Sequence, residues 1–382
     1  MNFLKKYKKV KILYLTDQVY LHGGIEKVLS QKANYFADSS GDEVFIVTYN
    51  QEGKTPVYDF SSKIIWEDLA INYEIGKSYF HPKNLKKIPK HISALKDVLG
   101  KINPDVVISS SFGPDFYFLP YIRKNSPKIK EFHGSRYFYE KQESGFKKRL
   151  LHLLNKIIEK KYTSIAVLNE DEQNFYTNDN IAVIPNPAEI SDKRAGLKSK
   201  KIMAAGRISP VKNFGDLIEI FSKISKDFPE WELHFFGEDY LGTQQLLEHK
   251  IAEFGLQNQI KFKGNVPDLK SEMQNYSIYA MTSETECFPM VLLESLSIGL
   301  PIISYDCPTG PKYIVKNEED SFLIPNKNLD IFTEKLKLLM ENEQLRQELS
   351  KRGLENVSRF EINIVMKQWQ NLFEKVSSSG KK

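Results

Sequence analysis

Two glutamates, Glu286 and Glu294, stand eight positions apart in a stretch where charged side chains are unusual. The segment SETECFPMVLLESLSIGLPIIS, residues 283–304, reads as a loop that runs into an apolar helix. Three leucines beside Glu294 indicate a helix that packs against a sheet, which disfavours a merely solvent-facing role for this glutamate. An ionised carboxylate there can accept two hydrogen bonds from a vicinal diol such as a ribose. Glu286, in the turn, is expected to lie nearer to the reacting end of such a ligand.

The helix that begins between the two glutamates can bind an anion. Pro289 suits its first position, because the missing N–H of proline costs nothing there. The free N–H groups of Met290 and Val291 are then expected to point toward the ligand, since a helix N-terminus favours phosphate or sugar oxygens.

A second segment in the C-terminal half of the chain, AAGRISPVKNFGDLIEIF, carries positive charges that could complement the two glutamates. A strand is expected to end at Gly206, Arg207 and Lys212 follow in the turn, and a helix begins near Asn213. Arginine binds two oxygens at once and lysine acts as a point charge, so the pair can clamp a pyrophosphate. Isolated in a loop, such residues carry little information. At a strand end, in the same half as the two glutamates, they indicate a binding site.

The first half of the chain has weaker signals. Gly23 and Gly24 follow the first expected strand and precede a helix, where glycines let a backbone approach a phosphate, although paired glycines are common in turns. The pair lacks the G-x-G-x-x-G spacing, which counts against a nicotinamide enzyme. His133 follows another strand, where a lone histidine is about as often structural as functional.

Length and composition are those of a globular chain with about two domains. It has 382 residues, 41% of them apolar, and a net charge of +5. Residues 1–190 hold 28 basic against 22 acidic side chains, and the rest hold 26 against 27. This surplus fits an anionic membrane surface, an anionic substrate or ordinary solvated lysines, and we expect no nucleic-acid partner. Cys287 and Cys307 form neither a disulfide framework nor a zinc motif, which fits a reducing cytoplasm, and no apolar run is long enough to span a membrane.

Short β-branched runs alternate with helical patterns along the chain, which predicts parallel sheets with helices on both faces. The runs are residues 10–17, 43–49, 105–111, 129–135, 164–169, 181–186, 201–209, 231–239, 259–265, 278–284, 301–306 and 321–326. A polar segment, 186–200, is expected to link two Rossmann-like halves. We predict domains at 1–190 and 191–360, with a helix and tail at 361–382 that return to the first domain. Ligands of such sheets bind at the carboxyl ends of strands, so the site is expected in a cleft between the two halves.

Together these motifs resemble a family 4 glycosyltransferase of the GT-B fold over essentially the whole chain. The resemblance rests on Glu-x7-Glu with FP after its first glutamate, the GLP that ends the helix, GRISPVKN, PNP and the Gly-Gly turn. DCPTGPKYIV, residues 306–315, is similar to a branch from capsule, exopolysaccharide and O-antigen gene clusters. The resemblance implies a retaining enzyme that moves a hexose or N-acetylhexosamine from a nucleotide diphosphate sugar, UDP rather than GDP-mannose, to a glycan or a polyprenyl-diphosphate-linked acceptor. It implies no cofactor and no metal.

The resemblance also implies roles for residues of the second half. Arg207 and Lys212 bind the diphosphate and stabilise its departure, Glu294 holds the ribose hydroxyls, and Glu286 contacts the donor sugar near C3. The remaining donor-pocket residues act through main-chain groups: Gly206, Phe288, Pro289, Met290 and Val291. Cys287 stands where many members have glycine, and the PTGP of residues 308–311 replaces a Gly-Gly pair.

In the first half, the resemblance implies that Gly24 closes over the diphosphate and that His133 approaches the sugar near C6 and C1. Retention ordinarily suggests a carboxylate nucleophile, but no candidate is obvious. The family instead implies same-face attack, in which the departing phosphate accepts the proton of the acceptor. The absence of an Asp-x-Asp pair fits replacement of a divalent ion by Arg207 and Lys212.

Other functions are compatible with a two-domain cleft. They are another sugar-nucleotide enzyme such as an epimerase, a phosphorylase, for which no pyridoxal-binding lysine motif is found, or a partner subunit that binds a sugar nucleotide without turnover. We expect a cytoplasmic protein peripheral to the inner face of the membrane. The basic segments KKYKKVK and HPKNLKKIPKH and the amphipathic segment GFKKRLLHLLNKIIEKKY carry this expectation, against the alternative that its leucines pack into the first domain.

Overall fold

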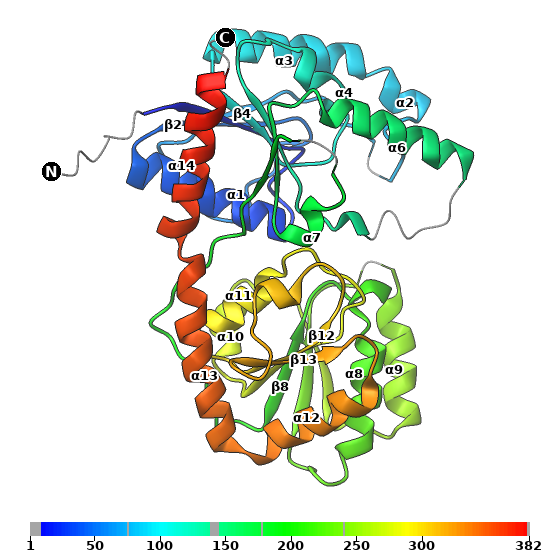
Figure 1. The fold of residues 1–382 in the computed structure, drawn as a ribbon. Coiled ribbons are helices and arrows are strands. Elements are labelled where there is room, and N and C mark those ends of the chain that lie inside the picture. The colour runs from blue at the N-terminus through cyan, green and yellow to red at the C-terminus, as the bar shows by residue number, and fades with distance from the viewer. Residues whose placement is uncertain (1–8, 75, 138–144, 177–178, 240, 380–382) are drawn as a thin grey trace, which may run out of the picture. The chain divides into compact units, whose positions relative to one another are not determined.

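The computed structural model describes residues 9–379 except 75, 138–144, 177–178 and 240. Within this part the chain forms two compact α/β units (Figure 1). With the gaps just named, the first unit comprises residues 9–133, 145–187 and 362–379, and the second comprises 134–137 and 188–361. The chain therefore passes from the first unit to the second after His133 and after Pro187, and returns to the first after Glu361.

The first unit is built on a parallel sheet of seven strands. In spatial order they are β3 (Ile65–Asp68), β2 (Glu43–Thr48), β1 (Lys11–Leu15), β4 (Val106–Ser109), β5 (Lys128–Glu131), β6 (Ser164–Val167) and β7 (Ile181–Val183). Alternate residues of β1 enter two separate cores, one on each face: Ile12 and Tyr14 in one, Leu13 and Leu15 in the other. Burial on both faces explains the nearly continuous apolar run of β1.

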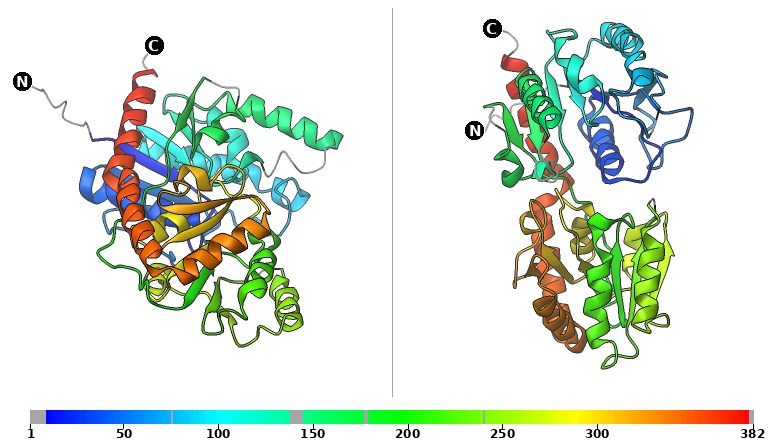
Figure 2. Two further views of the ribbon diagram at one scale, coloured as in Figure 1. Left: turned by 60° about the horizontal axis from the view of Figure 1, so that its bottom comes forward. Right: turned by 90° about the vertical axis from the view of Figure 1, so that its right-hand side faces the viewer.

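Helices of the first unit cover both faces of this sheet (Figure 1). They are α1 (Gly24–Asn34), α2 (Pro82–Leu85), α3 (Ile88–Ile102), α4 (Asp115–Phe118), α6 (Phe146–Glu159), α7 (Glu170–Gln173) and α14 (Ile362–Ser379). The last of these confirms that the C-terminal helix returns to the first unit. Trp369 and Phe373 of α14 are buried in one core, where Phe373 lies 5.4 Å from the Phe36 ring, and α14 runs beside α1 (Figure 2).

The second unit repeats the architecture with six parallel strands. Their order is β10 (Ile260–Gly264), β9 (Glu232–Phe236), β8 (Lys201–Ala205), β11 (Ile278–Met281), β12 (Ile302–Asp306) and β13 (Ser321–Pro325). One face packs on α8 (Phe214–Ile224), α9 (Thr243–Glu253) and α12 (Leu329–Glu341). The helices α10 (Leu269–Met273), α11 (Met290–Ser297) and α13 (Glu343–Val357) contact one another on the other side (Figure 1).

Strand order places a ligand site in each unit. In each sheet the first three strands are added side by side in one direction, and the fourth strand is added on the other side of the first. The order in the second unit is therefore 3-2-1-4-5-6, and the first unit has the same order with a seventh strand at its end. Ligands of such sheets bind at the carboxyl ends of the strands where the order reverses. These points lie between β1 and β4 and between β8 and β11. We call the side of each sheet where its strands end the carboxyl edge.

Two sequence expectations need correction. The strand β3 was not anticipated, because it is an edge strand whose Ile65 and Trp66 are exposed, so it lacks the apolar run of a central strand. Pro289 is the N-cap rather than the first helical residue, and α11 begins at Met290. The predicted strands all occur, and residues 189–200 of the polar segment contain no helix or strand.

Candidate active site

The turn after β8 depends on two glycines at the carboxyl edge of the second unit. Gly206 has φ +148°, and a Cβ on it would lie 2.6 Å from Cε of Lys212. Gly237, at the end of the neighbouring β9, has φ +137°, and a Cβ there would lie 2.0 Å from the carbonyl oxygen of Gly206. No side chain fits in either place. Glycine at both positions lets the Lys212 side chain cross the end of β8.

Lys212 and Glu286 form an ion pair at this edge. The Nζ of Lys212 lies 2.6 Å from Oε1 of Glu286, and the two side chains keep 19% and 13% of their surface exposed. Arg207, in the same turn as Lys212, is exposed and makes no ion pair within the part of the chain that the structure describes. Two cations thus follow β8 and one carboxylate follows β11, the two strands at the reversal. A diphosphate could bind the cations while the carboxylate accepts a hydroxyl.

The backbone of Glu286 is held by the loop after β12. The Thr309 hydroxyl lies 2.6 Å from the Glu286 carbonyl oxygen and 2.8 Å from the Ser135 hydroxyl. A Cβ on Gly310 would lie 2.8 Å from Cβ of Glu286, so glycine is required for this close packing. Thr309 has φ +73°, a conformation that favours glycine. The PTGP sequence therefore keeps a left-handed turn here without a second glycine.

The two predicted glutamates lie close to the same tyrosine. Burial, and after it the carboxylates of Glu286 and Glu294, raise the pKa of Tyr279, whose hydroxyl donates to the carbonyl oxygen of Ala205. Glu294 is buried in α11, one turn beyond its start. Both carboxylates therefore act electrostatically on one hydroxyl, which itself donates at the end of β8.

The start of α11 turns its side chains inward. Phe288 is buried, with its ring edge-on to Phe360 at 5.6 Å between centroids, and Pro289 is buried beside it. Cys287 is also buried and does not adopt a positive φ, so the turn forms without the glycine that is common in the family pattern. Burial of these side chains leaves main-chain groups to face a ligand at the start of α11.

In the first unit, the predicted residues Gly24 and His133 lie at the carboxyl edge. The helix α1 begins at Gly24 with the extended Gly23 as its N-cap, and a Cβ on Gly23 would lie 2.2 Å from Oε2 of Glu26. His133 follows β5, and its Nε2 lies 3.4 Å from Oε1 of Glu131. Burial raises the pKa of Glu26, which His133 partly offsets. In the first unit, His133 thus lies beside the carboxylate of Glu131 and interacts electrostatically with Glu26.

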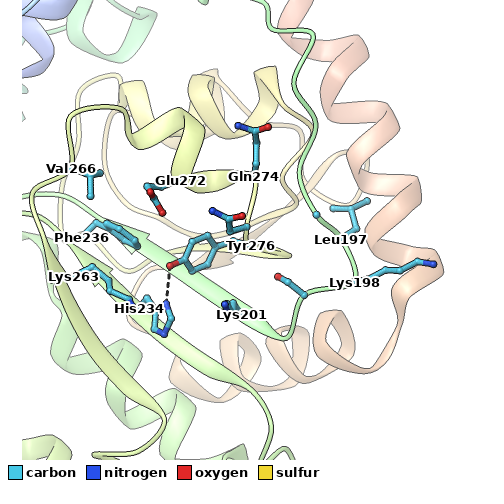
Figure 3. A pocket seen from close by; sticks show the side chains of 13 residues that line it. Leu197, Lys198, Lys201, His234, Phe236, Lys263, Val266, Glu272, Gln274 and Tyr276 are labelled. Carbon is cyan, nitrogen blue, oxygen red and sulfur yellow. Dashed lines mark hydrogen bonds between the residues drawn. The ribbon is translucent and has the colours of Figure 1, made fainter.

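The second unit also has a cavity of about 790 Å³ that is separate from the predicted donor site. It lies over β8, β9 and β10, where Figure 3 shows the Tyr276 hydroxyl pointing at Nδ1 of His234, 2.8 Å away. Lys201, Lys263 and Glu272 also line it. None of the site residues predicted from the sequence does, so this cavity is not the predicted site.

Neither a metal cluster nor a spanning helix is found in the described residues. No group of three or more His, Cys, Asp or Glu side chains there could hold a metal ion. No helix among them has the length and apolar character needed to cross a bilayer.

Two family models match the chain: "Glycosyl transferases group 1" over residues 186–356 and "Glycosyltransferase Family 4" over residues 22–192. The chain belongs to glycosyltransferase family 4. Each model covers most of one unit, so the recognition made from the motifs is confirmed for both halves of this glycosyltransferase.

Characterised and uncharacterised relatives align along this glycosyltransferase. An uncharacterized glycosyltransferase of Haemophilus influenzae is 26% identical over 372 residues, which cover 95% of this chain and 99% of that protein. The amylovoran biosynthesis glycosyltransferase AmsD of Erwinia amylovora is 23% identical over 375 residues, with the same coverage. A Campylobacter jejuni enzyme, named as an α-1,4-N-acetyl-D-galactosaminyltransferase for a diNAcBac-PP-undecaprenol glycan, is 23% identical over 244 residues, which cover 62% of this chain and 67% of that protein.

Solved structures confirm the GT-B fold class of this glycosyltransferase. TarM of S. aureus, solved with Fondaparinux, α-GlcNAc-glycerol and UDP, has a TM-score of 0.77 at 16% identity and covers 95% of this chain and 99% of its own. HepE of Anabaena, in complex with UDP, has a TM-score of 0.73 at 16% identity and covers 96% and 100%.

Motif reasoning missed Lys32, Glu131 and Thr309 of this glycosyltransferase. Lys32 and Glu131 are both buried at the carboxyl edge of the first unit and form an ion pair. Their sequence signal was weak: both are charged residues inside predicted elements, but β5 reads KIKE and α1 carries other charged residues, so neither stands out. Thr309 had no such signal, because its role depends on the loop geometry around Glu286.

Proposed function

We propose that this enzyme transfers a hexose or N-acetylhexosamine from a UDP-sugar, with retention, to a glycan or polyprenyl-diphosphate-linked acceptor during cell-surface polysaccharide synthesis. The observation that carries the proposal is the Lys212–Glu286 pair beside the exposed Arg207 at the strand reversal of the second unit. Arg207 and Lys212 bind the diphosphate, Glu294 accepts from the ribose hydroxyls, and Glu286 leaves Lys212 to accept from the donor sugar. Main-chain groups of Gly206 and of residues 288–291 complete the donor site.

The transfer step requires charge stabilisation on the leaving group. The bond from the anomeric carbon to the phosphate oxygen breaks, and a bond from that carbon to the acceptor hydroxyl oxygen forms on the same face. The proton of the hydroxyl passes to a phosphate oxygen, so the products are the glycoside and UDP. Arg207 and Lys212 stabilise the negative charge that develops on the diphosphate, the role for which other enzymes use a divalent ion. His133 and Gly24 of the first unit contact the sugar and the diphosphate, respectively.

The relatives support the finer parts of this proposal. The name of the Campylobacter enzyme specifies an α-linkage and an undecaprenyl-diphosphate glycan, which favours retention from an α-linked donor and a lipid-linked acceptor. The name of AmsD refers to amylovoran biosynthesis, which favours a role in polysaccharide synthesis. UDP is bound in the structures of TarM and HepE, which favours a UDP donor over GDP-mannose.

A donor screen tests the proposal. Purified enzyme would be offered UDP- and GDP-sugars with and without a polyprenyl-diphosphate-linked sugar, and UDP release, donor isomerisation and product anomeric configuration would be followed. We expect UDP release that depends on the acceptor, an α-linked product and no loss of rate in EDTA. Isomerisation without acceptor would indicate an epimerase. Binding without turnover, seen as thermal stabilisation by UDP alone, would indicate a non-catalytic partner.

We further propose that the enzyme binds the cytoplasmic face of an anionic membrane through α6 (Figure 2). Five large apolar side chains of this helix are exposed: Phe146, Leu150, Leu153, Leu154 and Ile157. Only Ile158 of its apolar residues is buried, so most of the apolar face does not pack into the first unit. Basic side chains flank it: Lys148, Arg149, Lys156, Lys160 and Lys161. Residues 5–8 of the basic N-terminal segment and the Lys147 side chain lie outside the described residues.

Liposome sedimentation tests the membrane proposal. Each basic residue near an anionic surface contributes about 1 kcal/mol, so binding should require anionic lipid and weaken in high salt. Replacing Leu150 and Leu154 together by serine should abolish binding. The matched change Leu338→Ser, at an exposed leucine of α12, should not. Equal binding to neutral liposomes, or none to either kind, would contradict the proposal.

A further inference from the structure

We propose that Glu131 is a positioning residue for His133: it holds the imidazole with Nε2–H directed at its carboxylate and leaves Nδ1 as the hydrogen-bond acceptor for a hydroxyl of the donor sugar. The inference rests on the proposed function, because His133 must contact the sugar for its orientation to matter. The new elements are Glu131, which does not touch the substrate, and the buried network that holds Glu131 in place.

The network is centred on one carboxylate. Oε1 of Glu131 lies 2.5 Å from Nζ of Lys32 and 3.4 Å from Nε2 of His133, and the Ser110 hydroxyl donates to Oε2 at 3.2 Å. The side chains of Lys32, Glu131 and His133 keep 1%, 3% and 7% of their surface exposed. A carboxylate accepts hydrogen bonds only, so His133 must be the donor to it. With its proton on Nε2, the ring presents Nδ1 as an acceptor.

The charge of Glu131 is secured by its neighbours. Burial alone raises the pKa of a carboxyl, but the attraction of Lys32, followed by that of His133, holds the pKa of Glu131 far below its ordinary value. Glu131 is therefore ionised near neutral pH, where its Oε1 can accept a hydrogen bond from Nε2 of His133.

The last helix fixes Lys32 in turn. Nζ of Lys32 lies 3.7 Å from the centroid of the Trp369 ring in α14 and 5.6 Å from that of Tyr14 in β1. A desolvated ammonium is attracted to the face of an indole ring. The ammonium is thus held between the carboxylate and two ring faces. The C-terminal helix is thereby linked, through Lys32 and Glu131, to the histidine at the carboxyl edge.

A second carboxylate near His133 does not play the same part. Glu26 of α1 interacts electrostatically with His133, but its Oε1 accepts from Nε2 of Gln18 at 2.5 Å. Among the described residues, His133 makes its ion pair with Glu131 and not with Glu26. This difference singles out Glu131 as the residue that orients the ring.

A double-mutant cycle tests the inference once a donor and acceptor have been found by the screen above. Glu131→Gln, His133→Ala and the two changes together would be compared with the wild type for kcat, donor KM and UDP affinity. We expect each single change to lower kcat at least about tenfold, the effect of one misplaced hydrogen bond of about 1.4 kcal/mol, with UDP affinity unchanged. We expect the double variant to be no more than about twofold slower than His133→Ala, because without the ring Glu131 has nothing to orient.

A charge-balanced variant covers the case in which Glu131→Gln folds poorly. The double change Lys32→Met with Glu131→Gln removes the buried cation and anion together, which avoids an uncompensated charge. It should melt near the wild-type temperature and show the same loss of kcat as Glu131→Gln.

Other outcomes would overturn the inference. If the losses multiply in the cycle, Glu131 acts through the fold rather than through His133. If His133→Ala leaves kcat unchanged while Arg207→Ala abolishes transfer, the inference fails and the proposed transferase stands. If Arg207→Ala and His133→Ala both leave kcat unchanged, the proposed site itself is wrong.

Discussion

The two carboxyl edges use charge in opposite ways. At the edge of the first unit, Lys32, Glu131, Lys130 and Asp115 are buried, and each has partners within the same unit. At the edge of the second unit, Lys212 and Glu286 keep part of their surface in solvent, and Arg207 is exposed. The first edge can hold a side chain rigidly in place, whereas the second can exchange its own ion pair for a charged ligand.

The cluster around Lys130 shows how far burial goes in the first unit. Its ammonium donates to the Ser109 hydroxyl at 3.1 Å and to the Ser109 carbonyl oxygen at 3.2 Å, and burial lowers its pKa to about 8. Burial raises the pKa of Asp115, which accepts from the Ser109 hydroxyl at 2.8 Å and from Tyr49 at 3.3 Å. Such satisfied groups have little capacity left for a ligand.

The largest expected effect compares two lysines. Lys32→Met should lower the free energy of unfolding by about 3–5 kcal/mol, because it leaves Glu131 buried without its ammonium. Lys212→Met should lower it by much less, since Glu286 keeps contact with solvent. Urea unfolding of both variants measures the difference. Equal losses of unfolding free energy in the two variants would contradict the proposed difference between the two carboxyl edges.

The second-largest expected effect is a loss of folding stability at low pH that originates in the first unit. Burial lowers the pKa of His91 from 6.5 to about 4. Between these values the unfolded chain binds more protons, so this group's contribution to stability is lost as pH falls from 6.5 to 4, by up to about 3 kcal/mol. His91→Phe, which keeps ring contacts with Tyr49 and Phe118, should flatten this part of the stability profile.

The control for this prediction lies on the surface of the second unit. Urea unfolding at pH 7 and pH 4.5 would be repeated with His249→Gln, whose side chain is exposed on α9. This variant should lose as much stability on acidification as the wild type does. A profile unchanged by His91→Phe would show that other groups govern the acid limb.

The third effect is a loss of transferase activity on substitution of charged residues in the second unit. Arg207→Ala, Lys212→Met and Glu286→Gln should each reduce transfer about 100-fold, the effect of losing one transition-state contact worth about 2.7 kcal/mol. The fold should survive in all three, as checked by thermal melting. Near-normal turnover of the Arg207 and Lys212 variants would remove the diphosphate clamp from the mechanism.

The smallest expected effect separates the two glutamates. Glu294→Ala should weaken binding of UDP about tenfold, or about 1.4 kcal/mol, because its proposed partner is the ribose. Glu286→Gln should barely change UDP affinity, because its proposed partner is the sugar. Calorimetry with UDP measures both. The reverse order would exchange the two roles.

The sequence by itself determined the architecture and the donor motifs. Alternating β-branched runs and helical patterns are local features, since a strand buried on both faces is mostly apolar. The same pattern predicted Arg207, Lys212 and Glu286 in turns that follow strands, and Glu294 in the helix after Glu286. The edge strand β3 did not follow, because its exposed Ile65 and Trp66 break that pattern.

Only the tertiary structure decided which charges meet. Lys32 and Glu131 are 99 positions apart, and the indole over Lys32 comes from the last helix. Lys212 and Glu286, 74 positions apart, were placed at one edge by the motif, but their direct pairing depends on the glycine turn at Gly206. A charge inside an apolar segment signals in sequence that it needs a partner, because burial without one is costly. The identity of the partner depends on the order of the strands and the return of the chain, which no local pattern encodes.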